Sequence, residues 1–291
     1  MKEKIAIIGV GKVGTAVGFL LKEKGYTIAS ICARHQESLD KAHDLIGGEP
    51  FLDAAEASKK GDVVLLTTGD DQIQKVCGEI AAKGGFCQGQ KVIHMSGASS
   101  LDVLKSAQES GAEILSIHPL QAFATISGAI EQLPGTVFGV TADENVIEWA
   151  YNFVEELGGR PIYIQDDQKL IYHAAACVVS NFFVTLMWIG KKMAMHVGMP
   201  DEMALDAYWP LVKGTFKNIE ENGPVGALTG PIVRGDVETI KGHRKKIAEE
   251  LRELLEVYDV LGRHTVEVAL EKGTINSEIA ENLMRQFEKA H

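Results

Sequence analysis

Along the first half of the chain, short runs of Val, Ile and Leu alternate with stretches whose apolar residues recur at helical spacing. This alternation is typical of a parallel sheet whose two faces are covered by helices. The runs predict strands over residues 4–8, 27–32, 62–67, 91–95, 113–117, 136–140 and 161–164. The intervening stretches predict helices over residues 13–24, 36–45, 72–83, 100–109 and 144–157, with Gly25 and Gly158 as C-caps.

The pattern becomes purely helical after about residue 165. Asp166 and Asp167 are candidate N-caps for a helix over residues 168–196. Further helices are predicted over residues 201–221, 236–261 and 277–289, with a Gly/Pro-rich connection over residues 222–235. Pro210 is expected to kink the first of these three helices.

Residues 170–189 are almost free of charge, so their length would suit a membrane span. The segment also contains His173, Ser180 and Asn181, which are costly in lipid. A helix buried between domains or subunits explains the composition better, and we expect no membrane association. Because so long an apolar helix needs cover on several sides, we predict a homodimer that buries part of it.

A glycine motif follows the first predicted strand directly and opens the first helix. In it Gly9 allows a tight turn, Gly11 lets a pyrophosphate approach the backbone, and Gly14 allows close helix–strand packing. We expect Gly9, Gly11, Lys12, Val13 and Gly14 to bind a dinucleotide at the helix N-terminus, the alternative being a purely structural turn. The predicted fold is therefore α/β, with a doubly wound Rossmann sheet over residues 1–165 and an all-helical domain over residues 166–291.

About twenty residues beyond Gly14, an NAD-preferring fold would present a carboxylate to the adenosine ribose. This chain has Ala33, Arg34 and His35 there instead. Arg34 can pair with a 2′-phosphate and stack on adenine, so the sequence favours NADP. The alternative is that Arg34 is a solvated residue at a strand end.

Polar residues also follow three other predicted strands, where the ligand crevice of an open α/β sheet lies. Thr68 and Ser96 are candidate cofactor contacts, although both lie in segments whose composition also suits plain turns. His118 is a candidate for proton transfer because imidazole titrates near neutral pH. A capping or core histidine is the alternative.

Composition excludes several classes of function. A net charge of −11, with no stripe of Lys and Arg, disfavours nucleic acid as a partner. The four cysteines form no close ligand pair and no disulfide pattern, so we expect reduced thiols, no metal and a cytoplasmic protein. The first residues contain too short an apolar run for a signal peptide.

Several longer motifs resemble one bacterial family that is uncharacterised. They are SIHPLQAF at 116–123, LPGT at 133–136, YHAAA at 172–176, Ser180-Asn181 and ALTGPIVRGD at 227–236. That family joins a Rossmann-like NADP-binding domain to a helical domain of unknown function, within the 6-phosphogluconate dehydrogenase-like folds. The wider class includes ketopantoate reductases, pyrroline-carboxylate reductases, hydroxyacid dehydrogenases and prephenate dehydrogenases. The resemblance implies reductase chemistry and no particular substrate.

Two further similarities concern the reacting groups. Lys169 resembles the lysine that serves the reacting oxygen in ketopantoate reductases, although His173 stands where those relatives have Asn. His118 resembles the histidine that contacts the reacting hydroxyl in prephenate dehydrogenases. At about 100° per residue, Lys169, His173 and Ser180 share one helix stripe, whereas Asn181 faces elsewhere. The alternative gives Lys169 a solvated position and His173 a satisfied buried hydrogen bond.

These features predict NADP-dependent hydride transfer to or from a small carbonyl compound that carries a carboxylate, such as a ketopantoate-like 2-keto acid. His118, Lys169 and His173 are the candidate catalytic residues, and Ser180 and Arg234 the candidate substrate contacts. Arg234 could instead be a structural ion-pair partner, and Asp236 is expected to cap the following helix. The alternatives are a prephenate-like dehydrogenase, an imine or pyrroline-carboxylate-type reductase, and a non-catalytic NADP-binding regulatory protein.

Overall fold

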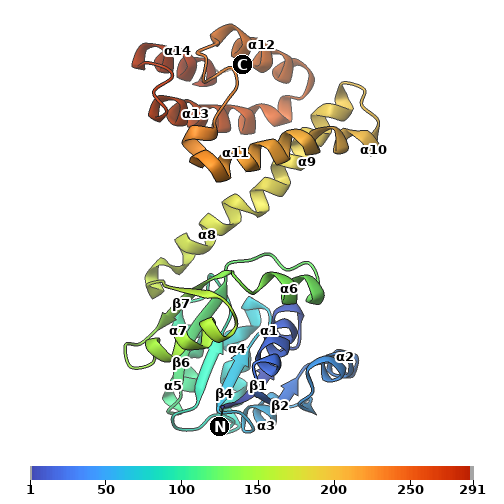
Figure 1. The fold of residues 1–291 in the computed structure, drawn as a ribbon, viewed down its shortest axis with the longest axis vertical. Helices are drawn as coiled ribbons and strands as arrows, with labels where there is room; N and C mark the ends of the chain where they lie inside the picture. The colour runs from blue at the N-terminus through green and yellow to red at the C-terminus, as the bar shows by residue number, and fades with distance from the viewer. Residues whose placement is uncertain (1, 289–291) are drawn as a thin grey trace. The chain divides into compact units, whose positions relative to one another are not determined.

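A computed structural model describes residues 2–288 of the chain, which divide into two compact units. Unit 1 ends at Phe182 and unit 2 begins at Phe183 (Figure 1). The boundary between the two units thus lies after residue 165, where the sequence pattern becomes purely helical. The reason is that the first helix of the helical region packs with the sheet of unit 1.

Unit 1 is built on one eight-stranded sheet with the strand order β3-β2-β1-β4-β5-β6-β7-β8. All neighbours pair in parallel except β6 and β7. The strands are β1 (Lys4–Ile8), β2 (Thr27–Cys32), β3 (Glu49–Phe51), β4 (Val63–Leu66), β5 (Lys91–His94), β6 (Glu113–Pro119), β7 (Val137–Ala142) and β8 (Arg160–Tyr163). The seven predicted strands are thus confirmed, each to within two residues at either end.

Helices cover both faces of this sheet, and a separate apolar core lies under each layer (Figure 1). The helices are α1 (Lys12–Glu23), α2 (Gln36–Ile46), α3 (Ala54–Ser58), α4 (Asp70–Ala82), α5 (Lys105–Glu109), α6 (Ile126–Gln132), α7 (Ile147–Glu156) and α8 (Lys169–Val179). Gly25 and Gly158 have φ of 84° and 79° at helix ends, which confirms their predicted role. The short elements β3, α3 and α6 were not predicted.

Close packing of β1 against α1 sets the shape of the glycine turn. Gly9 has a φ of 106°, and a Cβ on it would lie 2.8 Å from the backbone of Thr67 at the end of β4. A Cβ on Gly14 would collide with the Thr67 hydroxyl and the Gly9 carbonyl. The Thr67 hydroxyl donates to that same carbonyl at 2.6 Å. The positive φ of Gly9 confirms the tight turn predicted there, and the contacts at Gly14 confirm the predicted close packing of helix and strand.

The long apolar segment forms two helices rather than one. Helix α8 ends at Val179, Ser180 has φ −112° and ψ −69°, and α9 (Asn181–His196) begins directly after it. The predicted N-caps at the start are wrong. Gln168 occupies the N-cap position of α8, and the Asp166 carboxylate instead accepts from the Leu101 N–H at 2.9 Å.

Unit 2 contains only helices among its described residues. Besides most of α9 they are α10 (Asp201–Ala204), α11 (Trp209–Ala227), α12 (Val237–Glu250), α13 (Leu255–Glu271) and α14 (Ser277–Glu288). The last residue of the predicted helix 277–289 lies outside the described residues. The Asp236 carboxylate caps α12 by accepting from the Thr239 N–H at 3.0 Å, as predicted.

Two predictions for unit 2 are wrong for local reasons. The predicted helix over residues 201–221 is divided before Pro210, into α10 and α11, and Pro210 occupies the first turn of α11, where no N–H is needed. A further break, inside α11, lies at Gly223, whose φ of 69° precedes Pro224. The predicted helix over residues 236–261 is interrupted at Leu251, where φ is −143°, before α13 begins.

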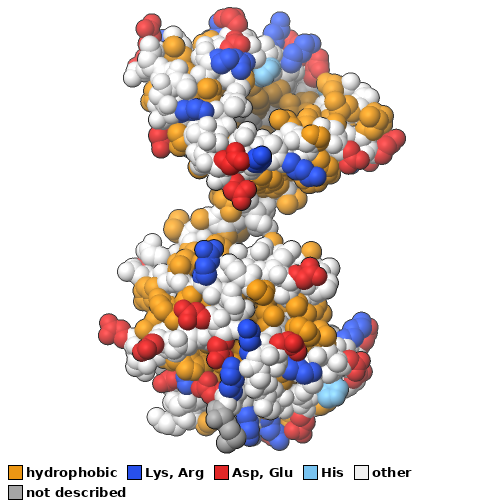
Figure 2. All heavy atoms as spheres, viewed as in Figure 1, with side chains coloured by type: hydrophobic (Ala, Val, Ile, Leu, Met, Phe, Trp, Pro, Cys, Tyr) orange, Lys and Arg blue, Asp and Glu red, His pale blue; other side chains and the backbone are white. Residues whose placement is uncertain are grey.

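Large apolar side chains lie exposed along α8 and α9. They are Leu170, Ile171, Val178, Val179, Phe182, Val184, Leu186 and Trp188. Residues 166–196 are long and apolar enough to cross a membrane by length and composition alone. In unit 2 hydrophobic side chains also gather at the surface over α9–α11 (Figure 2).

Candidate functional site

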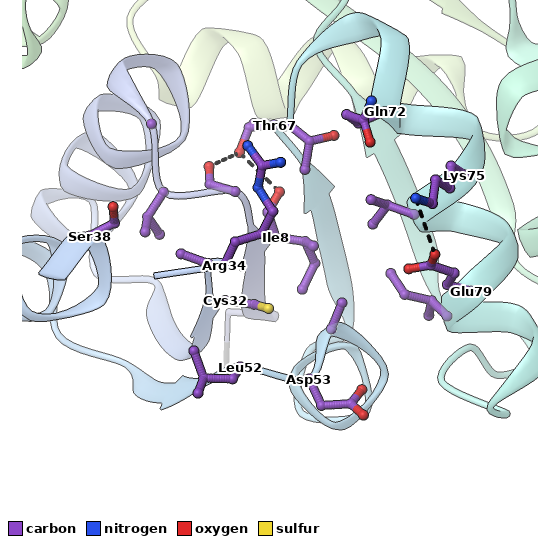
Figure 3. A pocket seen from close by; sticks show the side chains of 18 of the residues that line it. Ile8, Cys32, Arg34, Ser38, Leu52, Asp53, Thr67, Gln72, Lys75 and Glu79 are labelled. Atoms are coloured by element: carbon purple, nitrogen blue, oxygen red, sulfur yellow. Dashed lines mark hydrogen bonds and ion pairs between the residues drawn. The ribbon is translucent and has the colours of Figure 1, made fainter. Parts of the chain in front are cut away.

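A cavity of about 660 Å³ opens at the glycine turn of unit 1. Gly9 and Gly11 form part of its wall, together with the ends of β1, β2 and β4 and one side of α4. In Figure 3 the Arg34 side chain stands in the middle of this cavity, between Ser38 on α2 and Gln72 and Lys75 on α4. The turn predicted to hold a dinucleotide therefore borders a space that can contain one.

Two observations fit a dinucleotide in this nucleotide cavity. A Cβ on Gly11 would meet nothing within 4 Å, so the backbone there is open to the close approach of a diphosphate. Thr68, a predicted cofactor contact, has a buried hydroxyl without a hydrogen-bond partner, and it lines the cavity. An oxygen or an amide of a bound cofactor would give this hydroxyl the hydrogen-bond partner that it lacks. Lys12 and Val13 lie in the first turn of α1 and do not line the cavity.

The charges in the nucleotide cavity bear on the choice between NAD and NADP. Ala33 and Arg34 lie at the end of β2, and both line the cavity as predicted. Asp53, which was not predicted, also lines it. One Asp53 oxygen accepts from the Ala55 N–H at 2.8 Å, and the other accepts from the Lys83 ammonium at 2.7 Å. The Asp53 carboxylate is therefore already engaged in local contacts.

The turn over residues 96–99, after β5, lies between the nucleotide cavity and the remaining candidate residues. The Ser96 hydroxyl donates to the Asp70 carboxylate at 2.7 Å and accepts from the N–H groups of Ala98 and Ser99. Asp70 begins α4, directly after Gly69, which lines the nucleotide cavity. Ser96 therefore fixes the turn against the cavity, although it is not among the residues that line it.

Lys169 is buried to 98% at the start of α8, although the sequence allowed a solvated position. Its ammonium donates to the Ser116 hydroxyl of β6 at 2.6 Å and to the Ser96 carbonyl at 3.3 Å. Burial lowers the pKa of Lys169 to about 8. The negative charges of Asp166 and Asp70 raise this pKa, but their effect is smaller than that of burial. Lys169 thus joins α8 to the carboxyl ends of β5 and β6.

His118 lies near the end of β6 and is held by a residue that sequence analysis missed. Its Nδ1 lies 3.1 Å from the Tyr172 hydroxyl, and the two rings meet edge to face at 5.5 Å. Burial, then the charge of Lys169, then that of His173 lower the pKa of His118 to about 4. His118 is therefore neutral near pH 7. A neutral imidazole keeps one N–H, so the ring can donate a hydrogen bond, and the role of His118 in proton transfer stays a prediction.

A second cavity of about 610 Å³ lies beside His118, and α8 forms one wall of it. His173, Ala176 and Ser180 line this substrate-side cavity, as the predicted stripe requires, whereas Lys169 does not. Asn181 lines it as well, so the prediction that it faces elsewhere is wrong. The helical count fails there because the backbone departs from regular α-helix at Ser180.

The structure brings most of the candidate residues together in unit 1. A Cβ on Gly97 would lie 2.7 Å from the His118 ring and 2.8 Å from the His173 ring, so the turn over residues 96–99 touches both histidines. The His173 Nδ1 lies 3.8 Å from the Cys177 thiol, one helical turn along α8. Arg234 lies exposed in unit 2, just before α12, and its substrate role stays a prediction.

Sequence analysis missed Tyr172, Ser116 and His94 as contributors. His94 is fully buried at the end of β5, where its Nδ1 accepts from the Ser96 N–H at 3.2 Å. Burial and the charge of Lys169 lower its pKa to about 3. A buried strand ending in a histidine is the sequence signal that could have identified it. Tyr172 and Ser116 stood in the family motifs without an assigned contact.

The electrostatic link between Lys169 and His118 can be tested directly. Replacing Lys169 by Met removes a positive neighbour, which favours the protonated imidazole. The pKa of His118 should therefore rise from about 4 toward its ordinary value, so that the ring protonates at a higher pH. An NMR titration of the histidine ring protons measures this, with Lys75→Met as a charge control on α4. A His118 titration that is the same in Lys169→Met as in the wild type would contradict the link.

Comparison with known proteins agrees with this architecture. Residues 1–119 match a Rossmann-like domain, and residues 136–265 match a domain of unknown function, DUF2520. A solved protein of Thermotoga maritima is 25% identical, with a TM-score of 0.74 over 92% of this chain and 99% of that chain. A candidate NADP oxidoreductase of Bacteroides fragilis is 20% identical, with a TM-score of 0.71 over 91% and 98%.

A pyrroline-5-carboxylate reductase of Coxiella burnetii is 16% identical, with a TM-score of 0.58 over 100% of both chains. Among curated proteins none matches the sequence. Identities this low show a shared fold and no shared activity. The chain therefore joins an N-terminal Rossmann-like domain to a C-terminal DUF2520 domain.

Proposed function

We propose that the protein is an NADP-dependent oxidoreductase that transfers a hydride between the nicotinamide and a small carbonyl compound. One observation carries the proposal. The turn over residues 96–99 is bonded on one side to Asp70, at the edge of the nucleotide cavity, and touches His118 and His173 of the substrate-side cavity on the other. A substrate bound beside His118 would thus lie across one turn from the cofactor.

The chain's own residues would bind and orient the reactants. Gly9, Gly11 and Thr68 would hold the diphosphate region, and Arg34 would pair with the 2′-phosphate. His118 would donate a hydrogen bond to the substrate oxygen, while the buried ammonium of Lys169 stabilises negative charge that develops there. When bound, the cofactor supplies the hydride chemistry.

Lys169 acts at a distance in this proposal and does not bind the substrate, because its ammonium is bonded to Ser116 and Ser96. A carboxylate on the substrate would then need another anchor, for which Arg234 is the sequence candidate. His173 lines the substrate-side cavity and is the remaining candidate for moving a proton. All four cysteines are free thiols, which suits a location in the reducing cytoplasm.

The activity is tested by following NADPH oxidation with 2-keto acids, simple ketones and cyclic imines. Prephenate-like alcohols are tested in the opposite direction, by following NADP reduction. Turnover of a carbonyl compound is expected, and His118→Asn should lower kcat roughly 10²–10³-fold because a donor to the developing oxyanion is lost. NADPH affinity of the variant serves as the folding control. Tight NADPH binding without turnover of any compound would favour a regulatory NADP-binding protein instead.

The choice of cofactor is tested at Arg34. NADPH should bind more tightly than NADH. Arg34→Ala should lower the ratio of the NADH to the NADPH dissociation constant by about one to two orders of magnitude, as expected for a lost charge-assisted contact. Calorimetric titration with both nucleotides measures it, and Lys75→Ala is the control for a loss of positive charge in the same cavity. Equal affinities in the wild type, unchanged by Arg34→Ala, would contradict the assignment.

We also propose that the protein is a homodimer in which a second copy covers part of residues 170–190. The exposed apolar side chains on α8 and α9 support this, because a monomeric protein rarely leaves so many large apolar side chains of one short segment in water. Light scattering at micromolar concentration should give twice the monomer mass of 31.5 kDa. A monomer under those conditions would contradict the dimer.

A further inference from the structure

The space over Gly139 holds the Tyr172 ring against His118. In the antiparallel pair of β6 and β7, His118 lies directly opposite Gly139. A Cβ on Gly139 would lie 2.8 Å from the Tyr172 hydroxyl oxygen and 2.9 Å from its ring carbon. Only glycine at this position lets a residue of α8 place its hydroxyl beside the neighbouring histidine.

The hydrogen bonds of Tyr172 determine which nitrogen of His118 carries the proton. Burial raises the pKa of Tyr172, and the neighbouring backbone of Gly139 lowers it. The Tyr172 hydroxyl lies 3.1 Å from the His118 Nδ1. A phenol O–H is a stronger donor than the N–H of a neutral imidazole, so the hydroxyl is the donor that fits this bond. An Nδ1 that accepts a hydrogen bond leaves the proton of a neutral ring on Nε2.

The Nε2 atom lies on the side of the turn over residues 96–99, since a Cβ on Gly97 would be 2.8 Å from it. His118 also lines the substrate-side cavity. Because Nδ1 is engaged by Tyr172, a substrate that bonds to the ring meets the Nε2–H, and such a donor needs a lone pair on its partner. A ketone or aldehyde oxygen has lone pairs, whereas a protonated imine has none on its nitrogen.

The charges around the cavity favour the same class of substrate. Among the described residues that line the cavity there is no Asp or Glu to neutralise a cation. The buried ammonium of Lys169 lies close enough to perturb His118 electrostatically. A positive charge near the reacting atoms stabilises an alkoxide and repels an iminium ion.

We infer that Tyr172 is a positioning residue that fixes His118 as the Nε2–H tautomer, so that the site takes a carbonyl substrate whose oxygen gains negative charge, and rejects iminium substrates. The inference rests on the proposed hydride transfer and narrows its substrate class. In the reaction, the carbonyl carbon gains the hydride, the C=O electron pair moves to oxygen, and the alkoxide takes a proton from solvent or His173.

The tautomer is tested without substrate or cofactor by long-range ¹H–¹⁵N NMR of the histidine rings, with His118→Asn to assign the signal. The wild type should show His118 with a protonated Nε2 and a bare Nδ1. Tyr172→Phe should shift the Nδ1 signal toward a mixture of tautomers, while the control Tyr163→Phe, an exposed tyrosine on β8, should not. A wild-type ring protonated on Nδ1, or a spectrum unmoved by Tyr172→Phe, would overturn the inference.

The substrate class is tested with a matched pair, cyclohexanone and the cyclic imine piperideine, which is cationic near neutral pH. With NADPH, the ketone should be turned over at least about tenfold faster, and Tyr172→Phe should lower kcat for it about tenfold with little change in KM. Faster turnover of the imine would overturn the inference while supporting hydride transfer. Turnover of neither compound nor of any other carbonyl, with the expected tautomer in the spectrum, would overturn the proposed function instead.

Discussion

The arrangement of the site depends on one buried ammonium group. Lys169 lies at the start of α8 with 2% of its surface exposed. Removing such a charge from water costs several kcal/mol unless hydrogen bonds replace the lost hydration. The Ser116 hydroxyl and the Ser96 carbonyl supply them at 2.6 and 3.3 Å. Because these groups come from two strand ends, the position of α8 over β5 and β6 is tightly defined.

The same charge determines the state of the neighbouring rings. Both His94 and His118 have lowered pKa values, in which burial is the largest cause and Lys169 the second. Neutral histidines donate or accept hydrogen bonds in fixed directions, so their partners become part of the site geometry. For His94 the partner is the Ser96 N–H, which shapes the turn that is bonded to Asp70 and touches His118 and His173.

Features that depend on short stretches of sequence were well predicted. The apolar runs identified seven strands, and the glycine spacing identified the β1–α1 turn, because both are local consequences of chain geometry. Short elements at the edge, such as β3 with its central Pro50, carry too few residues for a periodic signal. The break of α12 at Leu251 also lacks a Gly or Pro signal, so one long helix was expected there.

Features of the site that depend on contacts between distant segments were not predictable in this way. A helical wheel gives the angular position of Lys169 but not that its ammonium would turn toward Ser116, 53 residues earlier. The wheel also assumes regular geometry, which ends at Ser180 and brings Asn181 to the cavity. The place of Asp53 in the wall of the nucleotide cavity, and its ion pair with Lys83, 30 residues later, likewise depend on the fold of distant segments.

The contact between Gly139 and Tyr172 has an evolutionary consequence. Any side chain at position 139 would displace the phenol, and losing the phenol would leave an empty space over β7 and an unsupported ring at His118. Neither position can therefore drift alone without a loss of fitness. Descendants of this chain should keep the glycine and the tyrosine together or exchange both, so that the two positions are inherited as a pair across the antiparallel strands.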